Sequence, residues 1–380
     1  MIATDGLTLV PVGFTNCYVL DSGEGLILID TGINTDENWD ALTAGLRAAG
    51  YEVRDVRLVL LTHYHFDHSG LAERVRQASG ARVLIHQDDA PLLAEGGRWR
   101  RQTANHRRLL QEHGVPARLL DWLDRTWERR GRHWYQDWHR QEPLFDGAGQ
   151  VRWSRFEQET PPPQDQEQPP LAPGDAQAHP DETAHHTETP SGAQPPIIPD
   201  GTVCEREVIA QGRLRLRAVH TPGHTPGHVC FLIEDAGVLF TGDHVLKHVA
   251  PNPAITFLGS RYEGRTRSIV WYVQSLQKVR DLPAQRVFPA HEQEVPDLPQ
   301  RVDRILRNHE RRAAQIRATL QGGATTAFDL LPALFPNLRV SALWTALSGV
   351  IGHLDLLEDR GEVEAVPLDG RIAYLRSMTG

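Results

Sequence analysis

Cysteine is scarce in this chain. Three cysteines, Cys17, Cys204 and Cys230, are spread over 380 residues. Thiols this far apart do not make a disulfide framework, and they suit a reducing compartment. The first ten residues also lack a basic segment followed by a long apolar stretch. We therefore expect no signal peptide and a cytoplasmic location.

Long apolar runs and a surplus of basic charge are absent as well. No apolar run approaches the ~20 residues that span a bilayer, so no membrane partner is expected. The chain holds 40 Lys and Arg against 49 Asp and Glu, a net charge of −9. This acidic balance argues against a protein that coats nucleic acid non-specifically. With 40% hydrophobic and 23% charged residues, the composition is that of a soluble globular protein.

Short apolar runs alternate with helical patterns over the first ninety residues. Strands are predicted at Leu26–Ile29, Val56–Leu61 and Arg82–Ile85, and helices at Trp39–Gly50 and Leu71–Ser79. Further strands are predicted at Leu214–Val219, Val229–Ile233 and Val238–Phe240. Strands that alternate with helices predict an α/β fold.

Two segments interrupt this alternation within the predicted catalytic domain, residues 1–299. Residues 98–145 are rich in Arg, Leu, Trp and His, and their apolar residues recur at helical spacing, which predicts a helical insertion. We interpret its tryptophans as packing anchors with a partial role as a lid over the site. Residues 157–199 are acidic and rich in Pro, with hardly any aliphatic side chains, so a disordered insertion is predicted there.

Residues 300–380 are predicted to form a C-terminal domain. Helices at Arg301–Leu320, Ala327–Leu334 and Ser341–Glu358 precede two short strands that are joined at Asp369-Gly370. Helices followed by a two-stranded ribbon are typical of a winged-helix module. The acidic residues of this segment nearly cancel its basic ones, which argues against nucleic-acid binding. We favour a role in a homodimer contact or in closing the active-site edge.

The strongest chemical signal is the run Thr62-His63-Tyr64-His65-Phe66-Asp67-His68, directly after a predicted strand. Imidazoles and a carboxylate this close together are costly to place in a core. Their spacing does not form one helix face, so we predict a loop that gathers ligands. Neutral imidazole and carboxylate are the donors that zinc and similar divalent ions prefer.

Three further loops place donors after short strands. They carry His224 within a Pro- and Gly-punctuated run, Asp243 after Phe240, and His291 after Phe288. Because open α/β folds build their sites along one edge of the sheet, these donors are expected to meet the first loop. The neighbouring histidines are interpreted as packing or hydrogen-bonding groups: His220, His228, His244 and His248.

From about Leu7 to Glu292 the chain resembles the metallo-β-lactamase superfamily, because the family motif H-x-H-x-D-H is matched and the later ligands follow in order. The resemblance implies an αββα sandwich and two divalent ions, zinc or alternatively iron or manganese. It implies a first ion held by His63, His65 and His224. It implies a second ion held by Asp67, His68 and His291, with Asp243 bridging both. Asp30 matches an aspartate that the family uses to orient the ligand loop.

Two ions that share a carboxylate can hold a hydroxide between them, and this hydroxide attacks a substrate carbonyl. Asp67 and Asp243 are then the catalytic carboxylates, with Asp67 also a proton acceptor. Within the family, the chain resembles the glyoxalase-II-like and β-lactamase-like hydrolases, some of which carry a C-terminal winged helix. We therefore expect hydrolysis of a small acyl ester or thioester. The alternatives are a lactonase, a phosphoesterase and, from another class, an endoribonuclease that uses the C-terminal module. Tyr262 is interpreted as an ordinary surface tyrosine, with assistance to a lactone ring oxygen as the alternative.

Overall fold

The computed structural model describes residues 6–96, 103–130, 143–153, 196–251, 253–257, 264–320 and 322–377. Most of the predicted insertion at 157–199 lies outside these ranges, as does Tyr262. The end of that insertion is described, and there the prediction of disorder is wrong. Ile197 is fully buried in the core and its N–H donates to the Leu93 carbonyl at 3.3 Å, because this segment leads directly into a strand of the first sheet.

The first sheet has the strand order β1-β2-β3-β4-β5-β6. Its strands are β1 Leu7–Val12, β2 Thr15–Asp21, β3 Leu26–Ile29, β4 Val56–Leu60, β5 Arg82–His86 and β6 Gly201–Val203. The pairing is antiparallel from β1 to β3 and parallel from β3 to β6. Helices α1 (Asp36–Ala48) and α3 (Ala72–Ser79) cover its outer face with apolar side chains such as Leu42 and Val75.

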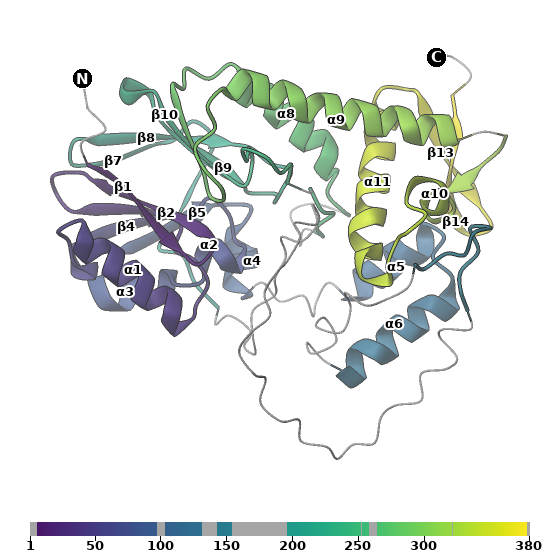
Figure 1. Cartoon of the computed structure of the whole chain (residues 1–380), viewed down its shortest axis with the longest axis horizontal. Coiled ribbons are helices and arrows are strands. Elements are labelled where there is room, and N and C mark those ends of the chain that lie inside the picture. The colour runs from purple at the N-terminus through teal and green to yellow at the C-terminus, as the bar shows by residue number, and fades with distance from the viewer. Residues whose placement is uncertain are drawn as a thin grey trace.

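The second sheet has the order β11-β10-β9-β8-β7 and packs on the first. Its strands are β7 Val208–Gln211, β8 Leu214–His220, β9 Val229–Ile233, β10 Val238–Gly242 and β11 Arg286–Pro289. Ile27 and Leu58 of the first sheet share a core with Leu216, Phe231 and Phe240 of the second. Helices α8 (Ser268–Arg280) and α9 (Leu298–Thr319) cover the outer face. The layers are helix, sheet, sheet and helix, which confirms the predicted αββα sandwich (Figure 1).

A mostly helical module lies beside the sandwich (Figure 1). Its elements are α5 Thr103–Glu112, α6 Ala117–Arg130, β12 Thr325–Thr326, α10 Ala327–Leu334, α11 Leu343–Asp359, β13 Val363–Leu368 and β14 Arg371–Arg376. Leu119 of α6 packs in the same core as Leu331 of α10 and Leu347 of α11. The predicted helical insertion and the predicted C-terminal segment therefore share one hydrophobic core, although they are far apart in sequence.

Helix α11 is the longest helix of the module, with 17 residues. Val340–Asp359 is the one helical stretch in the described part of the chain that is long and apolar enough to cross a membrane, with a mean hydropathy of 1.4. However, 72% of its apolar window is buried inside the protein, against α8, α9 and α10. This burial is that of a core helix.

Candidate metal centre

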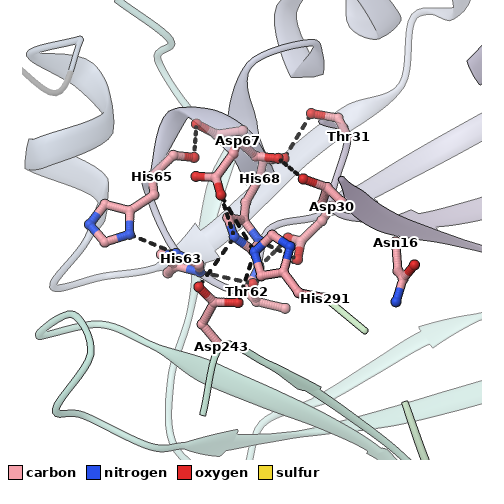
Figure 2. A network of polar contacts seen from close by, with 12 residues as sticks. Asn16, Asp30, Thr31, Thr62, His63, His65, Asp67, His68, Asp243 and His291 are labelled. Carbon is pink, nitrogen blue, oxygen red and sulfur yellow. Dashed lines mark hydrogen bonds and ion pairs between the residues drawn. The ribbon is translucent and has the colours of Figure 1, made fainter. Parts of the chain in front are cut away.

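The predicted donors meet at one edge of the sandwich, where several strands end (Figure 2). His63 and His65 follow β4, His224 lies between β8 and β9, and His291 follows β11. Asp243 follows β10 and approaches from the second sheet. The prediction of a loop from Thr62 to His68 is wrong in part. Asp67 and His68 lie in α2 (Phe66–Ser69), a single helical turn closed by the Gly70 N–H, which donates to the Phe66 carbonyl at 2.9 Å.

His63, His65 and His224 form one cluster of nitrogens, here called the first donor group. His65 Nδ1 lies 2.9 Å from His63 Nε2 and 3.0 Å from His224 Nε2. Zinc–nitrogen bonds are about 2.0–2.1 Å long, so two nitrogens on one ion lie no more than ~4 Å apart. The spacing of this group is within that limit.

Asp67, His68 and His291 form the second donor group. Asp67 Oδ2 lies 3.4 Å from His68 Nε2 and 3.5 Å from His291 Nε2. The side chain of Asp67 is 15% exposed, whereas that of His68 is fully buried. The second group therefore reaches solvent at Asp67 and at His291, whose side chain is 17% exposed.

Asp243 faces both groups. Its Oδ2 lies 3.3 Å from His224 Nε2 and 3.6 Å from His68 Nε2. Its other oxygen, Oδ1, lies 3.2 Å from His291 Nε2. A single carboxylate thus connects the first donor group with the second.

A buried nitrogen tests whether these residues fit a metal. His68 Nε2 has no hydrogen-bond partner among the described residues, although the side chain is fully buried. Leaving such a group unpaired costs about 1–3 kcal/mol. A divalent cation at this point would satisfy Nε2, and the surrounding imidazoles and carboxylates are the donor types that such ions prefer. The residues present fit a divalent metal centre.

The two donor groups differ in the pKa shifts of their histidines. Burial lowers the pKa of His63 well below its usual range, and the neighbouring His68 adds to the effect. Burial also opposes the charged form of His291, but Asp243 and Asp67 outweigh it and raise its pKa to about 10. His63 of the first group is therefore a neutral imidazole, ready to donate a lone pair. The second group pairs carboxylates with histidines whose protons an arriving cation would displace.

Asp30 supports the second donor group through its contact with His68 (Figure 2). Its Oδ1 accepts the Thr62 N–H at 2.9 Å, and its Oδ2 accepts the Thr62 hydroxyl at 2.8 Å. Asp30 Oδ2 also lies 2.9 Å from His68 Nδ1. Because a carboxylate only accepts, Nδ1 carries the proton and Nε2 is turned toward Asp67 and Asp243.

His228 supports Asp243 in a similar way. The backbone N–H of Asp243 donates to His228 Nε2 at 3.1 Å. The proton of this ring is therefore on Nδ1, which donates to the Thr221 hydroxyl at 2.8 Å. His228 positions the backbone of Asp243, as a hydrogen-bonding neighbour.

A further set of possible donors, His86, Asp88 and His220, lies away from the cluster. The His86 and His220 rings stack with their centroids 3.9 Å apart and their planes at 10°. Lone pairs in the planes of parallel rings do not converge on one point. Burial also lowers the pKa of His86 to about 3, so the stack is a packing contact between neutral rings.

Sequence reasoning missed Asp89, which lies between the two ligand loops. Its side chain is fully buried, and its carboxylate accepts hydrogen bonds from Tyr64, Thr225 and Gly227. The available signal was a carboxylate soon after β5, at the same edge of the sheet as the other donors.

Comparison with known proteins agrees with this geometry. The model of the metallo-beta-lactamase superfamily matches residues 10–291. The chain is 23% identical to "Probable metallo-hydrolase YqjP" of Bacillus subtilis, over 97% of this chain and 94% of that protein. It is 36% identical to "Lactamase-like protein adaB" of Aspergillus niger over 38% of this chain and 46% of that protein. It is 28% identical to "Atrochrysone carboxyl ACP thioesterase" of Aspergillus fumigatus over 36% and 43%.

Two solved structures share the fold over nearly the whole chain. A metallo-beta-lactamase family protein from Thermus thermophilus is 24% identical, with a TM-score of 0.66, and the match covers 98% of this chain and 99% of that one. A beta-lactamase domain protein from Burkholderia ambifaria is 20% identical, with a TM-score of 0.63, covering 99% and 93%. Both matches include the helical module, because they extend far beyond residue 291.

Proposed function

Since the chain belongs to the metallo-beta-lactamase superfamily, we propose that it is a dinuclear-metal hydrolase that cleaves a small acyl ester or thioester. The position of Asp243 carries the proposal. Its Oδ2 lies 3.3 Å from His224 of the first donor group, and its Oδ1 lies 3.2 Å from His291 of the second. A carboxylate between two donor groups is suited to join two ions. We propose zinc, with iron or manganese as alternatives, since the donors are imidazoles and carboxylates.

Each residue then has a defined task. Divalent ions in such a site lower the pKa of water and polarise the acyl oxygen of a substrate. His63, His65 and His224 would hold one ion, and Asp67, His68 and His291 the other. Asp30 keeps His68 Nε2 pointed into the site through the 2.9 Å contact with Nδ1. His228 fixes the backbone of Asp243.

Asp67 is the residue best placed to move a proton. Its carboxylate is 15% exposed and lies at the solvent side of the cluster. In the proposed reaction, Asp67 accepts a proton from the attacking water and returns it to the leaving oxygen or sulfur. The acyl carbon gains the water oxygen and loses the alkoxide or thiolate, so the products are a carboxylic acid and an alcohol or thiol.

The acyl class is supported by a relative of this chain. The Aspergillus fumigatus protein, which matches over 36% of the chain, is named "Atrochrysone carboxyl ACP thioesterase". A lactone is an internal ester, so a lactonase would use the same residues. A phosphoesterase would place a phosphoryl group at the same two donor groups.

The endoribonuclease alternative receives less support from the helical module. In helix-turn-helix units, the second helix of the pair is the one that contacts the nucleic acid. Here that helix would be α11, and most of its residues are buried against α8, α9 and α10. A buried helix does not present side chains to a nucleic acid.

The proposal is tested by the hydrolysis of a panel of substrates by zinc-loaded protein. The panel holds a short-acyl glutathione thioester, an aryl acetate, a simple lactone and an aryl phosphodiester. We expect turnover of the thioester or the acetate, and a loss of at least ~100-fold in Asp243→Asn. The exposed Asp235→Asn variant is the matched control and should retain activity. Turnover of the phosphodiester alone would replace the acyl assignment with a phosphoesterase.

A further inference from the structure

Asp89 is a buried carboxylate that belongs to neither donor group. It lies between β5 and α4 (Ala90–Ala94), and its side chain is fully buried. Burying a carboxylate is costly unless it accepts hydrogen bonds or is paired with a charge. The hydrogen-bond partners of the Asp89 carboxylate indicate its role.

Three donors bind the Asp89 carboxylate. Oδ2 accepts the Tyr64 N–H at 3.1 Å and the Thr225 hydroxyl at 2.7 Å. Oδ1 accepts the Gly227 N–H at 2.6 Å. Tyr64 lies between His63 and His65, and Thr225 directly follows His224. One side chain therefore ties together the two loops that supply the first donor group.

The contact is close enough to require glycine at position 227. A Cβ added to Gly227 would lie 2.5 Å from Asp89 N and 2.8 Å from Asp89 Cγ. No side chain fits in that space, so the loop after His224 reaches the carboxylate with its backbone. Direct backbone hydrogen bonds fix a loop more tightly than contacts between flexible side chains do.

Asp30 and Asp89 each contact a different donor group of the cluster. Asp30 contacts His68 of the second donor group, at 2.9 Å. Asp89 contacts both loops of the first group and holds them in register. We propose that Asp89 is a positioning residue for the first donor group, which sets the ion affinity of that group without contacting the ion; this inference rests on the metal-dependent function proposed above.

The test measures the affinity for each ion separately. Metal-free, full-length protein is titrated with Zn²⁺ against a chromophoric chelator, and its Co²⁺ adduct is followed by visible absorption. His224→Ala and His291→Ala identify which affinity and which absorption bands belong to the first and second donor groups. Asp89→Asn keeps the size of the side chain but replaces one acceptor oxygen by an NH₂ group, which opposes one of the three donors.

We expect Asp89→Asn to weaken Zn²⁺ binding at the first group by ~10- to 100-fold and to shift the Co²⁺ bands of that group. Affinity at the second group should change by less than about threefold. Asp88→Asn is the matched control. Asp88 is next to Asp89 in the sequence, but its Oδ2 lies 3.7 Å from His86 Nδ1. The Zn²⁺ affinities of both donor groups should therefore match those of the wild type. Thr225→Val removes one donor and keeps the shape of the side chain, so it should weaken the first group several-fold.

The possible results distinguish a failure of the inference about Asp89 from a failure of the proposed function. Wild-type affinity at the first group in Asp89→Asn overturns the inference and leaves the proposed function standing. Equal losses at both groups, with a lower melting temperature of the metal-free protein, assign Asp89 a general structural role and also overturn it. If Asp89→Asn does not fold, Thr225→Val decides between these outcomes. A wild-type chain that binds no Zn²⁺ overturns the proposed function and the inference together.

Discussion

At the scale of single residues, the centre depends on acids that orient its histidines. Asp30 bonds Thr62 through both oxygens and also contacts His68. The backbone of Asp30 is left-handed, with φ of 56°, a conformation that aspartate tolerates better than most residues. The loss of a positioning group of this kind typically costs a metal site about 10- to 100-fold in affinity.

Replacing Asp30 by Asn should weaken the second donor group. The amide has one acceptor oxygen where the carboxylate has two, so Thr62 and His68 compete for it. We expect Zn²⁺ affinity at that group to fall by ~10- to 100-fold. Competition titration with a chelator measures the change, and the exposed Asp36→Asn variant serves as the control. Unchanged affinity in Asp30→Asn would show that His68 is oriented by other contacts.

Gly227 offers a second test at this scale. The added methyl group of Gly227→Ala would overlap Asp89, which forces the loop after His224 to move. We expect a loss of about 1–3 kcal/mol in the free energy of unfolding. Gly147→Ala is the control, because nothing lies within 4 Å of a Cβ at that position. Equal melting temperatures of the two variants would contradict the close packing of Gly227 on Asp89.

At the scale of elements, the periodicity of the sequence predicts most strands and helices, but local patterns did not reveal everything. Helix α8 was not predicted, because Ile269, Val270, Trp271, Tyr272 and Val273 are β-branched or aromatic residues that favour strands. Burial on several sides stabilises them in a helix. The helical turn α2 was also missed, since one turn is too short for a period to appear.

Helices α9 and α11 contain a buried histidine pair. His309 Nδ1 lies 3.1 Å from His353 Nε2, and His353 Nδ1 donates to the Gly349 carbonyl at 2.7 Å. Burial lowers the pKa of His309 to about 4 and that of His353 to about 3. Both rings are therefore neutral at pH 7, and the network of neutral rings joins the two helices.

This pair should make the protein sensitive to acid. Below pH 6.5 the unfolded chain takes up protons that the folded protein refuses, so stability falls as the pH drops from about 6.5 toward 4. The loss is about 2 kcal/mol per histidine at pH 5. Urea unfolding between pH 7 and 5 measures it in the metal-free protein. The double variant His309→Leu/His353→Leu should show a flatter pH dependence, and an unchanged slope would assign the acid sensitivity to other groups.

At the scale of the whole molecule, local sequence patterns did not reveal the long-range contacts. The motif H-x-H-x-D-H and the three later donors could be recognised because each is a local pattern. Asp89 was not recognised as a supporting residue, because only its place after β5 is local, whereas its partners are 25, 136 and 138 positions away. The shared core of the helical insertion and the C-terminal segment was hidden for the same reason.

That shared core predicts coupling across the chain. Leu119 of α6 is fully buried in the same hydrophobic core as Leu347 and Ile351 of α11. Leu119→Ala should cost about 2–5 kcal/mol and should lower hydrogen-exchange protection of the α11 amides. The exposed Arg125→Ala variant on the same helix is the control. Full protection of α11 in Leu119→Ala would mean that the two segments fold independently.

The central claim is that one chain binds two divalent ions joined by Asp243. Equilibrium dialysis of the purified protein against Zn²⁺, followed by elemental analysis, tests it most directly. We predict two ions per chain in the wild type. In Asp243→Ala, which should remain folded, we predict weaker binding of the two ions, because the carboxylate that joins them is gone. A wild-type stoichiometry of one ion or none, or two ions retained with wild-type affinity in Asp243→Ala, would contradict it.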